Sequence, residues 1–239
     1  MKALLKFSVL IGCLLPFISF AQEITQNLSV NNDSYVNSLN TTGNFGNSST
    51  FWVSQSAAIG ETNRAFISFD FSSLPENAIV TTATLKIYAA TVNGSSNLDL
   101  FVERVDSLWH EDTIHWNNQP NAYFSDQVSI PNTISSQSGW QEFDVSDHVQ
   151  EFINAPWYNQ GWRIRLQDET ISSDYGIEYT SSEGSSNQPV LEVKYILPAE
   201  LSTSVTHCTN GNTDGQLLVN MTGGNNFNES NMRIYKVVR

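Results

Sequence analysis

The stretch ATLKIY at residues 83–88 decides the fold class, because its apolar and polar side chains alternate. In an extended chain Ala83, Leu85 and Ile87 share one face, and the residues between them point the other way. The stretch LEVKY at residues 191–195 repeats this pattern. Clusters of Asn, Ser, Gly and Thr separate such segments, and helical periodicity is nearly absent. The sequence therefore predicts an all-β fold, an antiparallel sandwich. Further strands are predicted at residues 50–54, 64–71, 98–105, 139–143, 162–167 and 174–180.

Two segments depart from the strand pattern. Residues 144–152 carry helix N-cap candidates, followed by Val145, Val149 and Phe152 at helical spacing, which predicts a two-turn helix that closes one end of the sandwich. Residues 27–49 are dense in Asn, Ser, Thr and Gly and are interpreted as an ordered loop.

The first 21 residues have the pattern of a secretory signal peptide, a basic start followed by an apolar run and a small residue, Ala21, at the cleavage position. Lys6 interrupts the run and Gln22 and Glu23 close it, so no membrane span is expected. A lipoprotein is the alternative, since residues 10–13 (LIGC) resemble a lipid-attachment box. The expected location is secreted, either extracellular or at the cell surface.

The acidic balance of the chain excludes several kinds of partner. Removing residues 1–21 takes away two lysines and no acidic residue, so 9 basic residues stand against 24 acidic ones, a net charge of −15. Nucleic acid and anionic membrane surfaces are poor partners for such a chain. Cys208 is then the one remaining cysteine, so the domain depends on its core without an intrachain disulfide.

A domain boundary is predicted after residue 197, where LPAE at residues 197–200 has the composition of a linker. The expected organisation is a signal peptide at residues 1–21, a β-sandwich at 22–197, and a linker with a short β-rich C-terminal fragment at 198–239. Those last residues are too few for a secure independent core. We therefore expect a monomeric module from a larger multidomain protein.

Several motifs, in this order along the chain, resemble the DNRLRE domain, which overlaps carbohydrate-binding module family 96. They are DSYV at residues 33–36, GNFG at 43–46, RAFISFDFSSLP at 64–75, Trp109 with WNNQP at 116–120, Trp140 with FDV at 143–145, and SSE at 181–183 with PVL at 189–191. The resemblance covers about residues 25–197 and implies a jelly-roll-like sandwich on secreted bacterial proteins, often beside polysaccharide lyases or hydrolases, with alginate binding in some members. The family's Ser-Arg-Glu is SSE here, so its arginine is missing.

The C-terminal fragment resembles a different family. VTHC at residues 205–208, Gly211, DG at 214–215 and GG at 223–224 follow the order of the SprB-type repeat of bacterial surface adhesins. From residue 225 onward the chain departs from that pattern, so a partial repeat is expected.

Aromatic side chains are candidates for carbohydrate contact, because a sugar ring packs its C–H bonds on an aromatic face. Trp109 and Trp116 lie in the family-like segment, where packing of a loop is the alternative role. Trp157 and Tyr158 follow a proline in the loop 154–161, where a core role is less expected.

Three arginines are candidates for binding an acidic sugar. On an extended strand Arg163 and Arg165 point to one face about 7 Å apart, where they could grip a uronate carboxylate, with salt bridges to nearby acids as the alternative. Arg64 is the third; the resemblance places an arginine there, and Glu183 is a candidate for either its buried partner or a binding residue.

Asp33, with neighbouring Asn side chains and loop carbonyls, is the candidate for a structural Ca²⁺ site. Catalytic motifs are lacking in the sequence: there is no HExxH, no EF-hand spacing and no GxSxG. His115 beside Trp116 is the single weak candidate for lyase chemistry.

The leading hypothesis is a non-catalytic carbohydrate-binding module for a polysaccharide, with alginate or another uronate glycan among the candidates. A chain of charge −15 repels a polyanion, so that ligand would need an arginine patch or bridging Ca²⁺, and a neutral glycan would not. The alternative is a structural or adhesin spacer, and a polysaccharide lyase ranks third.

Overall fold

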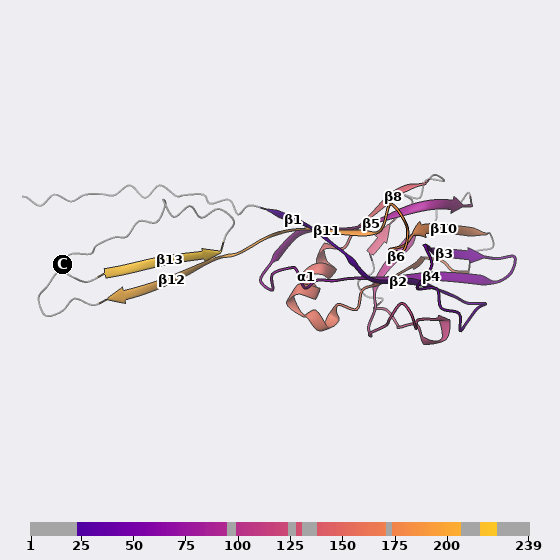
Figure 1. Ribbon diagram of the computed structural model, residues 1–239, viewed down its shortest axis with the longest axis horizontal. Coiled ribbons are helices and arrows are strands. Elements are labelled where there is room, and N and C mark those ends of the chain that lie inside the picture. Colours follow the sequence, from indigo (N-terminus) through magenta and orange to yellow (C-terminus); the bar gives the residue numbers. More distant parts are fainter. Residues whose placement is uncertain are drawn as a thin grey trace, which may run out of the picture.

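The computed structural model describes residues 23–94, 99–123, 128–130, 138–170, 174–206 and 216–223 (Figure 1). The expectations for the signal peptide, for the LIGC box and for Cys208 lie outside the described residues. So does most of the segment compared with the SprB-type repeat after residue 206.

The regular structure of the described chain is mostly antiparallel β-sheet with one short α-helix, as predicted. The strands of the sandwich, in chain order, are β1 (Ile24–Leu28), β2 (Val30–Asn37), β3 (Thr50–Ser56), β4 (Glu61–Phe69), β5 (Ile79–Asn93), β6 (Leu100–Arg104), β7 (Val128–Ile130), β8 (Gly139–Asp144), β9 (Trp162–Leu166), β10 (Tyr175–Thr180) and β11 (Val190–Ile196). Two short 3₁₀ helices, η1 (Trp116–Asn118) and η2 (Pro156–Tyr158), lie in the connections.

Two strands each pair with three others. β5 pairs with β10, β11 and β8, and β4 pairs with β2, β3 and β9. The strand order β1-β11-β5-β10-β3-β4-β9-β6-β7 therefore describes one curled sheet whose inner face encloses the core. This is the all-β sandwich that the alternating segments predicted.

The alternation at residues 83–88 correctly predicts which side chains face the core. Ala83, Leu85 and Ile87 of β5 have no exposed surface, and the residues between them are half-buried. In β9 the alternation is also correct about the core face, since Trp162 and Ile164 are fully buried in the core. Each fully buried side chain of this size contributes about 1.5–3 kcal/mol, so the shared apolar face is the main source of stability.

The interpretation of residues 27–49 as a loop was wrong in part, since residues 30–37 form β2. β2 pairs with β4 from Val30 opposite Phe69 to Asn37 opposite Asn63. Val36 is fully buried, so the strand also packs a side chain. Backbone pairing with a distant strand outweighs the low strand propensity of Asn, Asp and Ser.

The predicted helix is present as α1 (Ser146–Asn154), shifted by two residues. Val149 and Phe152 are buried, and α1 packs against β5 at the end of the sandwich from which β11 leads to the C-terminal hairpin (Figure 1). Val145 occupies the N-cap position, and the side chain of Asp144 accepts a hydrogen bond from the Ser146 N–H at 3.0 Å.

Beyond the sandwich, β12 (Ala199–Thr206) and β13 (Gln216–Gly223) pair with each other in a separate two-stranded sheet. Figure 1 shows this hairpin extending away from the sandwich. Within the described residues, no helix has the length and apolar character needed to cross a membrane.

Candidate functional site

A groove of about 230 Å³ lies on the surface formed by β2, β3 and β4. Two side chains from each strand line it: Tyr35 and Asn37, Trp52 and Ser54, Glu61 and Asn63. This groove was not predicted from the sequence, because Tyr35 was assigned to a loop. Trp52 could have been found, since it alternates with the buried Phe51 and Val53 and must therefore face outward.

The polar side chains of the groove form one hydrogen-bonded network. The Asn63 amide donates to Ser54 Oγ and to Glu61 Oε1, both at 2.7 Å, and accepts from the Asn37 amide at 2.9 Å. Asn63 itself is buried. These contacts fix the positions of donors and acceptors before any ligand arrives, which lowers the entropy cost of binding.

The two aromatic rings of the groove, Tyr35 and Trp52, pack against neighbouring groups of the sandwich. Tyr35 stacks on Phe45 with ring centroids 4.3 Å apart and planes 17° from parallel. The Trp52 ring lies beside Gly176 of β10, where an added Cβ would stand 3.6 Å from the indole. The pKa of Tyr35 is raised by burial and by the carboxylates of Glu61 and Glu178, so the phenol stays neutral and can donate a hydrogen bond.

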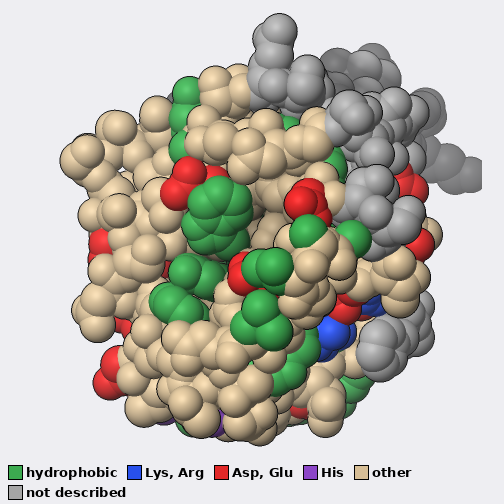
Figure 2. Space-filling model, turned by 90° about the vertical axis from the view of Figure 1, so that its right-hand side faces the viewer, with side chains coloured by type: hydrophobic (Ala, Val, Ile, Leu, Met, Phe, Trp, Pro, Cys, Tyr) green, Lys and Arg blue, Asp and Glu red, His purple; other side chains and the backbone are tan. Residues whose placement is uncertain are grey.

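Figure 2 shows the end of the sandwich that lies farthest from the C-terminal hairpin. Hydrophobic side chains gather on this face next to acidic ones, and basic side chains show only near one edge. Such a face suits an uncharged ligand better than a polyanion.

Arg64 of β4 is held by groups other than the one expected. Its guanidinium forms a two-point ion pair with Glu169, with nitrogen–oxygen distances of 2.8 and 2.6 Å. It also donates to Gln119 at 3.1 Å and lies 4.7 Å from the centre of the Trp116 ring. Glu183, one of the candidates for its partner, does not form this pair, because the fold brings Glu169 to Arg64 instead.

Arg163 and Arg165 do share one face, as the alternation predicted, but both grip the same carboxylate. Arg163 donates to Glu103 Oε2 at 2.8 and 2.6 Å, and Arg165 donates to both oxygens at 2.9–3.2 Å. Glu103 is fully buried and the two arginine side chains are 8% and 13% exposed. The salt-bridge alternative is thus the arrangement present in this structure.

The remaining aromatic candidates separate into buried and exposed. Trp109 is 6% exposed, its indole N–H donates to the Gln160 carbonyl at 2.9 Å, and its ring meets Phe66 edge-on, so it packs the loop onto the sandwich. Trp157 and Tyr158 in η2 are 70% and 40% exposed, and their rings lie 5.9 Å apart. They lie in the connection between α1 and β9 and remain accessible to a ligand.

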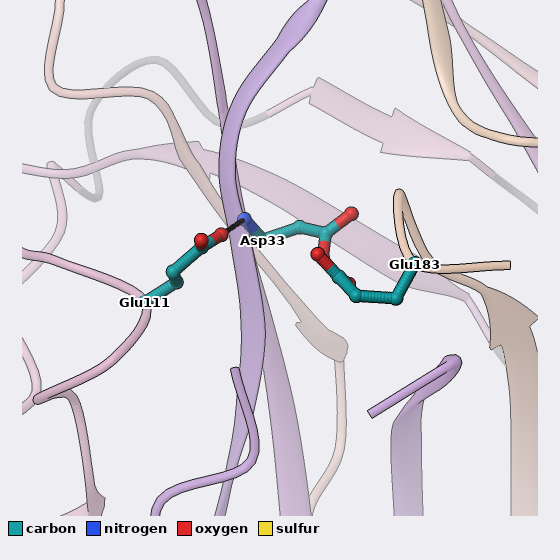
Figure 3. A group of neighbouring side chains, drawn as sticks. All are labelled: Asp33, Glu111 and Glu183. Atoms are coloured by element: carbon teal, nitrogen blue, oxygen red, sulfur yellow. Dashed lines mark hydrogen bonds between the residues drawn. The ribbon is translucent and has the colours of Figure 1, made fainter. Parts of the chain in front are cut away.

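Three carboxyl groups meet beside β2 (Figure 3). One oxygen each from Asp33, Glu111 and Glu183 lies within 4.8 Å of the others. Asp33 is fully buried; its Oδ2 accepts the Ser182 N–H at 2.7 Å, and its backbone N–H donates to Glu111 at 3.1 Å. The pKa of Asp33 is raised to about 7, mainly by burial and also by the two neighbouring carboxylates, while the Ser182 hydrogen bond opposes the shift.

Comparison with known proteins identifies relatives of the sandwich. The sequence profile described as carbohydrate-binding module family 96 matches residues 24–195. The tRNA nuclease WapA of Bacillus subtilis (strain 168) is 27% identical over 199 residues, which is 79% of this chain and 8% of that protein. The tRNA3(Ser)-specific nuclease WapA of Bacillus spizizenii matches with the same identity and coverage. The chain thus spans about 8% of the length of these curated relatives.

Proposed function

The chain belongs to carbohydrate-binding module family 96, and from this we propose that it binds a polysaccharide, without cleaving it, in the groove between β2, β3 and β4. The observation that carries the proposal is the pairing of two outward-facing aromatic rings, Tyr35 and Trp52, with a fixed amide network in one groove. Aromatic rings stack on the C–H face of a pyranose, and the amides meet its hydroxyls.

The charge around the groove favours a neutral glycan over alginate. Glu61 lines the groove, and Glu178 lies near enough to raise the pKa of Tyr35. A uronate carboxylate entering there would meet these charges at short range, where repulsion is strongest. The groove is also smaller than the roughly 300–1,000 Å³ of pockets for drug-sized ligands, so it would contact a short stretch of a long chain.

A uronate glycan has a different candidate surface, which includes two of the residues predicted from the sequence, Arg64 and Trp116. There Arg64, Trp116 and Gln119 lie together, with the Arg64 side chain 22% exposed. A uronate would have to replace Glu169 in the two-point pair with Arg64. Binding there would break the charge-assisted hydrogen bonds between Arg64 and Glu169, so we rank this surface below the groove as a binding site.

The test is affinity electrophoresis of residues 22–239 against soluble neutral glycans and uronate glycans, with an assay for new reducing or unsaturated ends. We expect retardation by a neutral glycan and no released product. Trp52→Ala should weaken binding by at least about tenfold, since loss of a central aromatic hot spot costs about 2 kcal/mol or more and tenfold corresponds to about 1.4 kcal/mol. The matched control is Trp157→Ala, which removes an exposed indole elsewhere.

Other outcomes would indicate a different binding site or a different function. Normal binding by Trp52→Ala together with loss in Trp157→Ala would reject the groove and favour the exposed η2 aromatics. Retardation by alginate alone, abolished in Arg64→Ala, would favour the uronate surface. Released product would make the chain an enzyme, and no retardation by any glycan would remove the binding function.

The second candidate function is a spacer or adhesin segment of a secreted, cell-surface protein. The observation that favours it is the β12–β13 hairpin, which forms its own sheet after the sandwich and supports a boundary near residue 197. The chain also covers only about 8% of its curated relatives, which is typical of one module in a long protein. A monomeric sandwich that binds no glycan would support this function.

The nuclease activity named for the WapA proteins is not proposed for this chain. With 24 acidic residues against 11 basic ones, it offers little to attract a phosphate backbone.

A further inference from the structure

Within the described part of the chain, no basic side chain pairs with the carboxyl cluster of Asp33, Glu111 and Glu183. Like charges this close repel one another, and burial strengthens the repulsion around Asp33. A cluster of this kind needs either a bound proton or a bound cation.

Asp33 supplies independent evidence that a ligand belongs there. The residue is 0% exposed, and its Oδ1 receives no hydrogen bond from any described residue. Buried carboxylate oxygens almost always have a partner, because an unsatisfied one loses its hydration without replacement. Figure 3 shows the Asp33 carboxylate turned toward that of Glu183.

Side-chain hydrogen bonds to the backbone hold the loops that carry Glu111 and Glu183 in place. The Asn44 side chain donates to the Glu111 carbonyl at 2.5 Å and to the Ile114 carbonyl at 2.9 Å, which ties down the loop that carries Glu111. On the other side, Ser181 Oγ donates to the Ser48 carbonyl at 2.6 Å and fixes the turn that carries Glu183. The cluster is thus assembled before any ion binds.

From this geometry we propose that Asp33, Glu111 and Glu183 form a Ca²⁺ site that fastens β2 to the loop of Glu111 and to the turn after β10 (Tyr175–Thr180). Two oxygens that bind the same Ca²⁺ at 2.3–2.6 Å lie no more than about 5 Å from each other. The three carboxyl oxygens of this cluster lie within 4.8 Å of one another, so one Ca²⁺ could contact all three. Ca²⁺ accepts irregular sets of six to eight oxygens, whereas Mg²⁺ demands a regular octahedron. Glu183 is exposed, so water can complete the coordination.

The site acts on the stability of the module, whichever of the two candidate surfaces binds a glycan. Asp33 lies two residues before Tyr35, and Glu111 lies in the connection that carries Trp116. Bound Ca²⁺ therefore fixes the segments that present both candidate sugar surfaces. Its loss should loosen these segments and lower the melting temperature, whichever glycan binds.

The experiment titrates metal-free residues 22–239 with CaCl₂ alone, by calorimetry and by thermal unfolding, with MgCl₂ in parallel. We expect one Ca²⁺ per chain, and a rise in melting temperature of roughly 5–10 °C at 100 times the dissociation constant. MgCl₂ should give a much smaller rise.

Two variants decide whether the ion binds at this cluster. Asp33→Asn keeps the shape of the side chain and should abolish both the binding heat and the thermal shift. Asp112→Asn, next to Glu111 on the same loop and exposed, should leave both unchanged. Absence of binding and of any thermal shift in the wild type would overturn the proposal, since a proton would then satisfy Asp33. Unchanged Ca²⁺ binding in Asp33→Asn would overturn it as well.

Discussion

Replacing Glu103 with glutamine should destabilise the sandwich severely. The carboxylate is fully buried and receives five hydrogen bonds from Arg163 and Arg165, at 2.6–3.2 Å. The amide of Gln removes the negative charge and turns one acceptor into a donor that faces guanidinium N–H groups. Burial already lowers the pKa of Arg163, and the carboxylate of Glu103 counteracts that effect.

The size of the effect follows from the burial of the partners. Breaking a buried ion pair by removing one charge costs about 3–5 kcal/mol, because the remaining charge is left uncompensated. A domain of 150–250 residues loses about 2–4 °C per kcal/mol, so the melting temperature should fall by roughly 6–20 °C.

Thermal and urea unfolding of residues 22–239, followed by tryptophan fluorescence, measures this change. The matched control is Glu142→Gln, whose side chain is 60% exposed and lies 3.9 Å from Lys86, so it should change stability by less than about 1 kcal/mol. A Glu103→Gln protein that melts within 2 °C of the wild type, about the shift that 1 kcal/mol produces, would refute the reasoning. It would mean that the contacts of Glu103 with the two arginines contribute little to the stability of the fold.

Three further outcomes are expected. Burial raises the pKa of Tyr175 to about 12, so the folded state keeps a proton that the unfolded state loses near pH 10. Between pH 10 and 12 this residue alone should lower the stability by up to about 2.7 kcal/mol, in addition to the contribution of Tyr179, whose pKa is also raised by burial. Urea unfolding at pH 11 should therefore show a smaller loss of stability in Tyr175→Phe than in the wild type. Gly161→Ala should destabilise more than Gly60→Ala: both glycines have positive φ, but an added Cβ stands 2.3 Å from the Ile67 carbonyl at the first and meets nothing at the second, and equal melting temperatures would contradict this. Leu85→Ala should cost about 2–5 kcal/mol in urea unfolding, since the residue is fully buried; a cost below 1 kcal/mol would argue against its place in the core.

The fold was largely predictable, because alternation is a local property of the chain. Residues 83–88 and 162–166 revealed which side chains face the core without reference to any other strand. β2 was missed because Asn, Asp and Ser dominate its sequence, and its pairing with β4 depends on residues about 30 positions away. A strand held mainly by distant backbone partners leaves a weak local signal.

The candidate sites were less predictable. Asp33 was identified from its residue type and setting, but its companions Glu111 and Glu183 come from distant parts of the chain. The arginine pair was placed on one face correctly, whereas Glu103 lies about 60 residues earlier and gave no sign of its role. Charge partners depend on which strands become neighbours, and sequence spacing does not report that.

The sequence by itself determined the class of the fold and the buried face of each regular strand, because a period of two places side chains on opposite sides wherever the strand lies. Tertiary structure alone decided which outward-facing groups meet. It set Trp52 beside Tyr35 and Asn63 in one groove, and it brought Glu111 to Asp33 from 78 positions away. The physical reason is that burial follows local alternation, whereas a binding site needs several elements to converge, and that convergence is settled by strand pairing across the whole chain.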